Sequence, residues 1–173
     1  MVTTRPAPIT REAVLAALED VKDPEIPVVS VVDLGIVQSV EVAGADVTVS
    51  ITPTFTGCPA LAVMRAEIAA CVRALGAATV RVPVVLDPPW SSDRIAPEAR
   101  ARMARIGLAP PPPSRRFAAD ASLGLVVAAP EPVACAFCGS TDTTLENPFG
   151  PTICRSLHYC NGCQQPFEQF KAL

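Results

Sequence analysis

Apolar residues recur every three or four positions in two stretches of the first half of the chain, which is the spacing of a helix with one buried face. The first stretch predicts a helix over residues 10–22, with Thr10 as its N-cap. The second predicts a helix over residues 58–75, with Pro59 in the first helical position. A shorter helix is expected over residues 97–106.

Apolar and polar residues alternate in three further stretches, which is typical of strands with one buried face. The expected strands cover residues 35–42, 46–52 and 79–86, and the first two form a hairpin. Because Pro83 cannot donate a backbone hydrogen bond, the third strand should lie at a sheet edge or be interrupted there. The order helix, strand, strand, helix, strand predicts an α+β domain with its helices over one face of a small sheet.

Composition and net charge limit the classes of protein to which the chain can belong. Half of the 173 residues are apolar, which is enough for a packed core. No segment reaches the roughly 20 uninterrupted apolar residues of a membrane span, and no long apolar run follows the N-terminus as in a secretory signal. A cytoplasmic location without a membrane partner is therefore expected. There, seven cysteines indicate metal or thiol chemistry rather than disulfides. The net charge of −3 argues against a nucleic-acid partner.

Two Cys-x-x-Cys pairs near the C-terminus are the strongest chemical signal in the chain. In each pair one tight turn can aim both sulfurs at a single point, and four thiolates suit the tetrahedral preference of Zn²⁺. A segment of about 40 residues rarely buries enough apolar surface to fold alone, so metal binding would supply the missing stability. The sequence therefore predicts a structural zinc ribbon, with two disulfides or four unconnected thiols as the alternatives. The predicted zinc ligands are Cys135, Cys138, Cys160 and Cys163.

Two other residues of the ribbon have ligand side chains. Cys154 is a candidate additional ligand, and His158 is the only histidine of the chain. Because His158 stands two residues before Cys160, its ring is expected to point away from the metal. Four thiolates also suit iron–sulfur chemistry, so the spacing alone leaves a cluster in place of zinc open.

Outside the ribbon, Cys58 is the sharpest candidate for chemistry. It is expected at the N-cap or in the first turn of a helix, where unpaired N–H groups and the helix dipole favour an anion and lower the thiol pKa. Such a thiolate could bind a soft metal or act as a nucleophile; the alternative is a small buried cap residue. Asp23 and Glu25 flank Pro24 in a rigid loop, where carboxylates bind a hard metal, act as general bases, or cap helices and brace turns. Cys71 lies on the apolar stripe of its helix and is expected to pack in the core.

These features divide the chain into three parts. Residues 1–107 form the α+β domain, residues 108–132 a proline-rich linker, and residues 133–173 the zinc ribbon. An arginine-rich stretch between residues 93 and 116 is either a solvated helix face or a surface that docks an acidic protein.

Four motifs of the first part resemble the small metal–sulfur assembly domain family, which includes the SufT maturation protein. They are Asp23-Pro-Glu-Ile-Pro27, Val32-Asp-Leu-Gly-Ile-Val37, Thr54-Phe-Thr-Gly-Cys-Pro59 and Pro88-Pro-Trp90. Together with the ribbon segments 149–155 and 159–171, nearly the whole chain looks like the PaaD-type family of phenylacetate-degradation proteins.

The resemblance implies an accessory, non-catalytic role in the ring epoxidation of phenylacetyl-CoA, where separate subunits carry the di-iron oxygenase and the flavin/iron–sulfur reductase. Cys58 would be a transient ligand for iron or an iron–sulfur cluster, and Asp23 and Glu25 would shape the site. The oxygenase or reductase subunits would be the partners, and a homo-oligomer stays open. Two other functions also stay open: a constitutive docking subunit of the oxygenase complex, and a zinc-ribbon regulator that binds nucleic acid.

Overall fold

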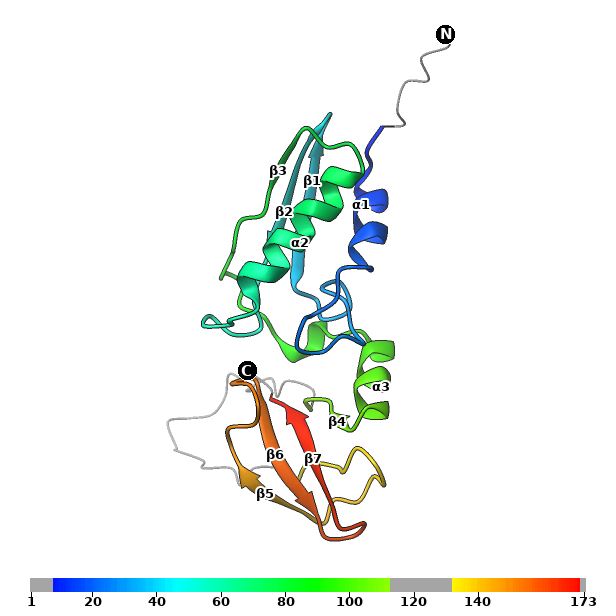
Figure 1. Ribbon diagram of the computed structural model, residues 1–173, viewed down its shortest axis with the longest axis vertical. Helices are drawn as coiled ribbons and strands as arrows, with labels where there is room; N and C mark the ends of the chain where they lie inside the picture. Colours follow the sequence, from blue (N-terminus) through cyan, green and yellow to red (C-terminus); the bar gives the residue numbers. More distant parts are fainter. Residues whose placement is uncertain (1–7, 113–131, 172–173) are drawn as a thin grey trace, which may run out of the picture. The chain divides into compact units, whose positions relative to one another are not determined.

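The computed structural model describes residues 8–112 and 132–171. The chain forms two compact units that divide inside helix α3 (Pro97–Arg105), between Ala99 and Arg100. Unit 1 is the part up to residue 99, and unit 2 is the part from residue 100 onward. Figure 1 shows the elements of each unit in the colours of the sequence.

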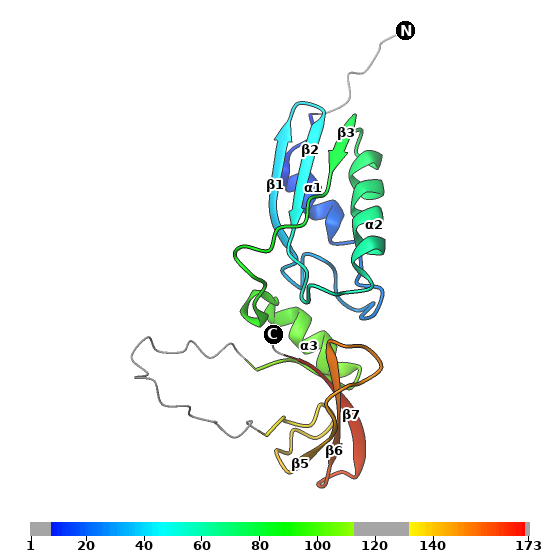
Figure 2. The ribbon, with the colours of Figure 1, turned by 90° about the vertical axis from the view of Figure 1, so that its left-hand side faces the viewer.

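Unit 1 is a three-stranded sheet covered on one face by two helices, as Figure 2 shows. The strand order is β1-β2-β3; β1 and β2 are antiparallel, and β3 runs parallel to β2. Helix α1 packs against α2 and β1, and α2 packs against β3. The predicted α+β fold is therefore confirmed. The elements are α1 (Arg11–Leu18), β1 (Val37–Ala43), β2 (Asp46–Ile51), α2 (Leu61–Ala74), β3 (Thr79–Arg81) and a 3₁₀ turn η1 (Ser92–Arg94).

The core of unit 1 is built from the predicted apolar faces. Every second residue of β2 is buried, and so is every fourth residue along α2. The Thr10 side chain accepts a hydrogen bond from the Ala13 N–H and caps α1 as expected. The buried side chains of these three elements are Val14, Leu18, Val47, Val49, Ile51, Met64, Ile68 and Val72.

Element boundaries differ from the predicted ones where distant segments pair. Helix α1 ends at Leu18, four residues before the expected end, because Val21 accepts a backbone hydrogen bond from Val31 and Asp23 donates one to Val29. The third strand ends at Arg81, two residues before Pro83, although the chain touches β2 again at Val84.

Unit 2 contains a four-stranded sheet in the order β4-β7-β6-β5. Its strands are β4 (Leu108–Ala109), β5 (Thr143–Asn147), β6 (Arg155–Cys160) and β7 (Gln165–Phe170). Strands β5, β6 and β7 are antiparallel neighbours, and β4 adds to the edge of β7 in parallel. Leu108 and Ala109, which we expected to open the linker, thus form a strand of the ribbon sheet. The linker limits at residues 108 and 132 stay a prediction, because residues 113–131 lie outside the described part of the chain.

Candidate metal centre

The four cysteines of the two Cys-x-x-Cys pairs converge in unit 2. Their sulfur atoms all lie within 4.8 Å of one another, and within the described ranges they are the only such group of three or more Cys, His, Asp or Glu ligands. The first pair lies in the turn before β5, and the second pair joins β6 to β7. Because the β6–β7 turn folds back beside the first turn, residues far apart in sequence meet. The group comprises Cys135, Cys138, Cys160 and Cys163.

The spacing of the sulfurs fits a tetrahedral metal ion. Sγ of Cys135 lies 3.7 Å from Sγ of Cys163, and Sγ of Cys138 lies 3.6 Å from Sγ of Cys160. A tetrahedron with metal–sulfur bonds of about 2.3 Å has edges of about 3.8 Å. A disulfide needs about 2.05 Å, and all four cysteines are free. The donor set therefore fits Zn²⁺, and the disulfide alternative does not describe this geometry.

Backbone N–H groups are aimed at two of the sulfurs. Phe137 donates to Sγ of Cys135 at 3.4 Å, and Cys163 donates to Sγ of Cys160 at 3.5 Å. The Cys163 N–H is the main reason that the pKa of the Cys160 thiol is lowered to about 7. Burial and hydrogen bonds with the neighbouring sulfurs raise the pKa of Cys163 to about 12. The thiolate of Cys163 is therefore disfavoured next to the other sulfurs unless a cation compensates its charge.

The two turns have the same backbone design. The residue after the second cysteine of each pair adopts the left-handed conformation: Gly139 has φ +74° and Gln164 has φ +56°. The first cysteine of each turn also accepts a backbone hydrogen bond through its carbonyl oxygen, from Gly139 in one turn and from Gln164 in the other. Gln164 is the only residue other than glycine with positive φ in the described part of the chain. This conformation costs a non-glycine residue about 1–2 kcal/mol.

The Gln164→Gly variant should therefore be more stable than the wild type, by about 0.5–1 kcal/mol after the larger loss of glycine's backbone entropy. Thermal unfolding of the zinc-supplemented protein, followed by ribbon amide resonances, measures the change. The reverse exchange at the equivalent position, Gly139→Gln, should cost about 0.5–1 kcal/mol by the same two terms, because a Cβ there meets no atom within 4 Å and adds no steric penalty. An unchanged or lower stability of Gln164→Gly would contradict the strain.

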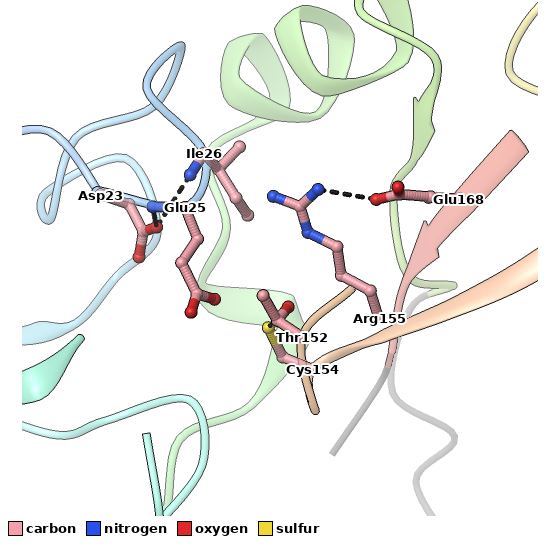
Figure 3. A network of polar contacts seen from close by, with 7 residues as sticks. All are labelled: Asp23, Glu25, Ile26, Thr152, Cys154, Arg155 and Glu168. Carbon is pink, nitrogen blue, oxygen red and sulfur yellow. Dashed lines mark hydrogen bonds and ion pairs between the residues drawn. The ribbon is translucent and has the colours of Figure 1, made fainter. Parts of the chain in front are cut away.

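The other ligand-type residues of the ribbon lie outside the sulfur group. Cys154 is buried, and its Sγ contacts the Thr152 hydroxyl oxygen at 3.1 Å (Figure 3). His158 is buried too; its Nε2 lies 3.0 Å from the Ser156 hydroxyl, and its ring stacks on Phe167. As expected, His158 does not join the four sulfurs. Neither Cys154 nor His158 is part of the ligand group within the described residues.

The acidic loop of unit 1 is held by its own carboxylate. Asp23 is buried, and its Oδ1 accepts hydrogen bonds from the N–H groups of Glu25 at 2.8 Å and Ile26 at 2.9 Å (Figure 3). Asp23 thus braces the turn, which was one of the roles expected for it. The Glu25 side chain is half-buried and projects from this turn.

Cys58 lies beside this acidic loop, but its predicted pKa was wrong in sign. Burial is the main cause that raises the thiol pKa, and the charges of Glu25 and Asp23 raise it further. Hydrogen bonds from the N–H groups of Ala60 and Leu61 lower the thiol pKa, as expected near the start of a helix. Their effect is smaller than the rise caused by burial and the two charges. Helix α2 begins only at Leu61, so Cys58 lies in the preceding turn and not in the first helical turn.

Cys71, which was expected to pack in the core, is half-buried, and it and Trp90 each join two segments of unit 1. Sγ of Cys71 lies 3.3 Å from the Ala17 carbonyl oxygen, which joins α2 to α1. The Trp90 side chain is buried, and its Nε1–H donates to the Leu34 carbonyl oxygen at 2.8 Å.

Within the described residues, no helix combines the length and apolar character needed to cross a bilayer.

Comparison with known proteins separates the same two parts. Residues 121–171 match the family described as PaaD zinc beta ribbon domain, and residues 11–84 match the family described as iron-sulfur cluster assembly protein. An Escherichia coli (strain K12) protein, named as a putative subunit of 1,2-phenylacetyl-CoA epoxidase, is 36% identical over 167 residues, which are 96% of this chain and 96% of that protein. The chain belongs to the PaaD family. The resemblance inferred from the sequence motifs is thereby confirmed.

The first part of this PaaD-family chain also has relatives without a ribbon. The "Fe-S protein maturation auxiliary factor" of Porphyromonas gingivalis (strain ATCC BAA-308 / W83) is 38% identical over 93 residues, which are 52% of this chain and 87% of that protein. A conserved hypothetical protein from Thermotoga maritima has 30% identity and a TM-score of 0.50, covering 58% of this chain and 98% of its own. A fold of this kind therefore occurs by itself, and the PaaD-family chain adds the ribbon to it.

Proposed function

We propose that this chain is a non-catalytic maturation factor that helps to load iron or an iron–sulfur cluster into a component of phenylacetyl-CoA epoxidase in the cytoplasm. The observation that carries the proposal is the juxtaposition of Cys58 with the Asp23–Glu25 loop in the part of the chain that matches iron–sulfur cluster assembly proteins. Similarity along 96% of a relative that is named as part of this epoxidase supports the choice of client system.

In this proposal, the ribbon cysteines hold zinc for structure. Zn²⁺ has no redox chemistry, and a site closed by four protein thiolates leaves no open position for a substrate. The ion would join the turn before β5 to the β6–β7 turn, and two of its ligands, Cys135 and Cys160, belong to a buried apolar cluster with Ala109 and Phe167. Cys154 takes no part in this ligand set.

Cys58 would be a temporary ligand for the cargo. Because burial and two carboxylates raise its pKa, the thiol is protonated near pH 7 and is therefore a poor nucleophile and slow to oxidise. The same carboxylates attract a cation. An arriving Fe²⁺ offsets their charge and replaces the thiol proton, so that the thiolate forms only when the cargo is present. Glu25 is the stronger of the two charges acting on the thiol, and Asp23 holds the turn that presents it.

The proposed state of the thiol predicts a pH profile. The alkylation rate of Cys58 by iodoacetamide should be low at pH 7 and keep rising above the ordinary thiol pKa, because only the thiolate reacts. The Glu25→Gln variant removes a charge that raises the pKa, so its profile should move to lower pH. Mass spectrometry resolves the alkylation of each cysteine peptide. Glu41→Gln, which removes an exposed carboxylate on β1, is the control and should leave the profile unchanged. Unchanged alkylation in Glu25→Gln would contradict the charge effect.

The loading role is tested with the Cys58→Ser variant in cells that express the epoxidase subunits. Iron in the purified oxygenase and reductase should fall to the level found without this chain, while the variant itself folds normally and keeps its zinc. Glu41→Gln serves as the control, because it removes an exposed carboxylate of β1 outside the Asp23–Glu25 loop, so the variant should support full iron content. Normal iron content with Cys58→Ser would remove Cys58 from the mechanism.

The word "subunit" in the name of the Escherichia coli relative favours a second candidate, a constitutive docking subunit of the epoxidase complex. The two functions differ in stoichiometry. A maturation factor is needed in amounts far below those of the oxygenase, whereas a constitutive component co-purifies with it in equal amounts. Titrating expression of this chain against epoxidase activity separates them.

A further inference from the structure

An open groove of about 510 Å³ lies on unit 1, between helix α2 and the segment that follows α1. Its α2 wall consists of Glu67, Ala70 and Cys71, which are three and four residues apart and so share one face of the helix. Its volume lies within the range of roughly 300–1,000 Å³ that ligand clefts occupy. The facing wall is made by Asp20, Val21, Lys22, Asp23, Pro24 and Pro27.

The groove combines an apolar lining with an acidic rim. Val21, Pro24, Pro27 and Ala70 contribute carbon atoms, while the exposed carboxylates of the rim, Asp20 and Glu67, stand against a single ammonium group; the third carboxylate of the lining, Asp23, is buried. That ammonium, Nζ of Lys22, donates to the Glu19 carbonyl oxygen at 2.6 Å and so is directed to the end of α1.

The thiol in the groove is neutral. Burial raises the pKa of Cys71, the charge of Asp20 raises it further, and Sγ lies within hydrogen-bonding distance of the Ala17 carbonyl oxygen. Within the described residues, the groove contains no group of three ligand atoms close enough to hold a metal ion. Its chemistry therefore suits an organic cation with an apolar stem, which is what a lysine or arginine side chain presents.

We propose that this groove docks a peptide segment of a partner protein in which lysine or arginine alternates with aliphatic residues. The basic groups pair with Asp20 and Glu67 on the rim, and the aliphatic side chains and arginine stems cover Ala70 and the two prolines. Charge complementarity of this kind guides a partner into register more than it adds affinity.

The position of the groove gives the docking a use. Asp23 lines the groove, and its charge also acts on the Cys58 thiol, so the groove and the thiol adjoin the same loop. A segment seated in the groove therefore holds its protein next to Cys58. That this protein is the client that receives iron rests on the proposed function; the peptide chemistry of the groove does not.

The test uses the zinc-loaded full chain, labelled with ¹⁵N, and a synthetic peptide, acetyl-Leu-Arg-Leu-Lys-Leu-Arg-amide. Amide shifts should change in residues 20–27 and 67–71, and binding should weaken from 20 to 200 mM NaCl. A peptide with glutamate in place of each basic residue should not bind. Shifts confined to other parts of the chain, equal binding of both peptides, or no shifts at 1 mM peptide would each overturn the proposal.

Two pairs of variants sharpen the assignment. The double variant Asp20→Lys with Glu67→Lys reverses the rim charges and should lower the affinity for the basic peptide about ten-fold at 20 mM NaCl. The control, Glu41→Lys with Asp46→Lys, makes the same charge change at exposed positions on the sheet. It should alter the affinity less than about two-fold. Ala70→Trp fills the groove and should abolish binding, and Ala62→Trp on the same helix should not. Neither iron nor Cys58 enters these measurements. If the peptide does not bind, the proposed loading role is unaffected. If Cys58→Ser supports normal iron content, the proposed peptide binding in the groove is unaffected.

Discussion

The Cys160→Ser variant is expected to lose its bound zinc and the fold of its ribbon, while unit 1 stays folded. Cys160 is completely buried, and its Sγ lies 3.6 Å from that of Cys138 in the sulfur group. Structural zinc contributes about 10–16 kcal/mol of apparent folding free energy in small peptides, and the ribbon is too small to replace this with its own core. Elemental analysis should give about one zinc per chain for the wild type and nearly none for the variant. In the variant, amide resonances of β5, β6 and β7 should collapse to unfolded positions.

Cys154→Ser is the matched control for this loss. Cys154 is also buried in unit 2, but it lies outside the sulfur group. Its replacement should leave zinc content unchanged and lower stability only modestly, since a serine hydroxyl can still contact Thr152. A Cys160→Ser protein with full zinc and an intact ribbon would refute the four-ligand assignment. Loss of zinc from Cys154→Ser at normal stability would add Cys154 to the ligand set.

The metal-binding group could be predicted from sequence because each of its two cysteine pairs lies within four consecutive residues. A Cys-x-x-Cys turn presents both sulfurs whatever surrounds it, and the two turns needed only a hairpin to meet. The left-handed backbone at Gln164 was missed, since glutamine carries no signal for that conformation. The parallel with Gly139, which also follows the second cysteine of its pair, was the available clue.

The environment of Cys58 could not be predicted in the same way. It was expected at the N-cap or in the first turn of a helix but lies in the turn before α2, and the sign of its pKa shift depends on burial and on charges 33 and 35 residues earlier in the chain. Sequence periodicity gives neither quantity. The early end of α1 has a similar origin, because the Val21 carbonyl oxygen pairs with Val31 in preference to continuing the helix.

The structure explains the sequence motifs around residues 32–37 and 88–90: the turn at residues 33–35 is hydrogen-bonded to the segment of residues 90–96. The Asp33 carbonyl oxygen accepts from the Ala96 N–H at 2.9 Å, and the Leu34 carbonyl oxygen accepts from the Trp90 indole. The next residue, Gly35, passes close to Arg94, whose guanidinium donates to the Val37 carbonyl oxygen. The turn after Leu34 therefore positions the chain that leaves the sheet, and it requires a residue without a side chain.

The Gly35→Ala variant is accordingly expected to lose about 2–5 kcal/mol of unfolding free energy. Gly35 has φ +65°, which costs alanine about 1–2 kcal/mol. In addition, a Cβ atom would lie 2.5 Å from Cβ of Arg94 and 2.6 Å from its backbone carbonyl oxygen, and relieving such overlap typically costs about 1–3 kcal/mol more. Urea unfolding followed by the fluorescence of Trp90, the only tryptophan and a buried residue of unit 1, measures this loss.

Gly44→Ala isolates the steric part of the effect. Gly44 has the same φ of +65°, but a Cβ there meets no atom within 4 Å. Its variant should therefore lose only the conformational cost of about 1–2 kcal/mol. The difference between the two variants measures how tightly the Gly35 turn holds the Arg94 segment. Equal losses of stability would mean that the Arg94 segment moves to accommodate the added methyl group. Glycine would then be required at position 35 only for its backbone conformation.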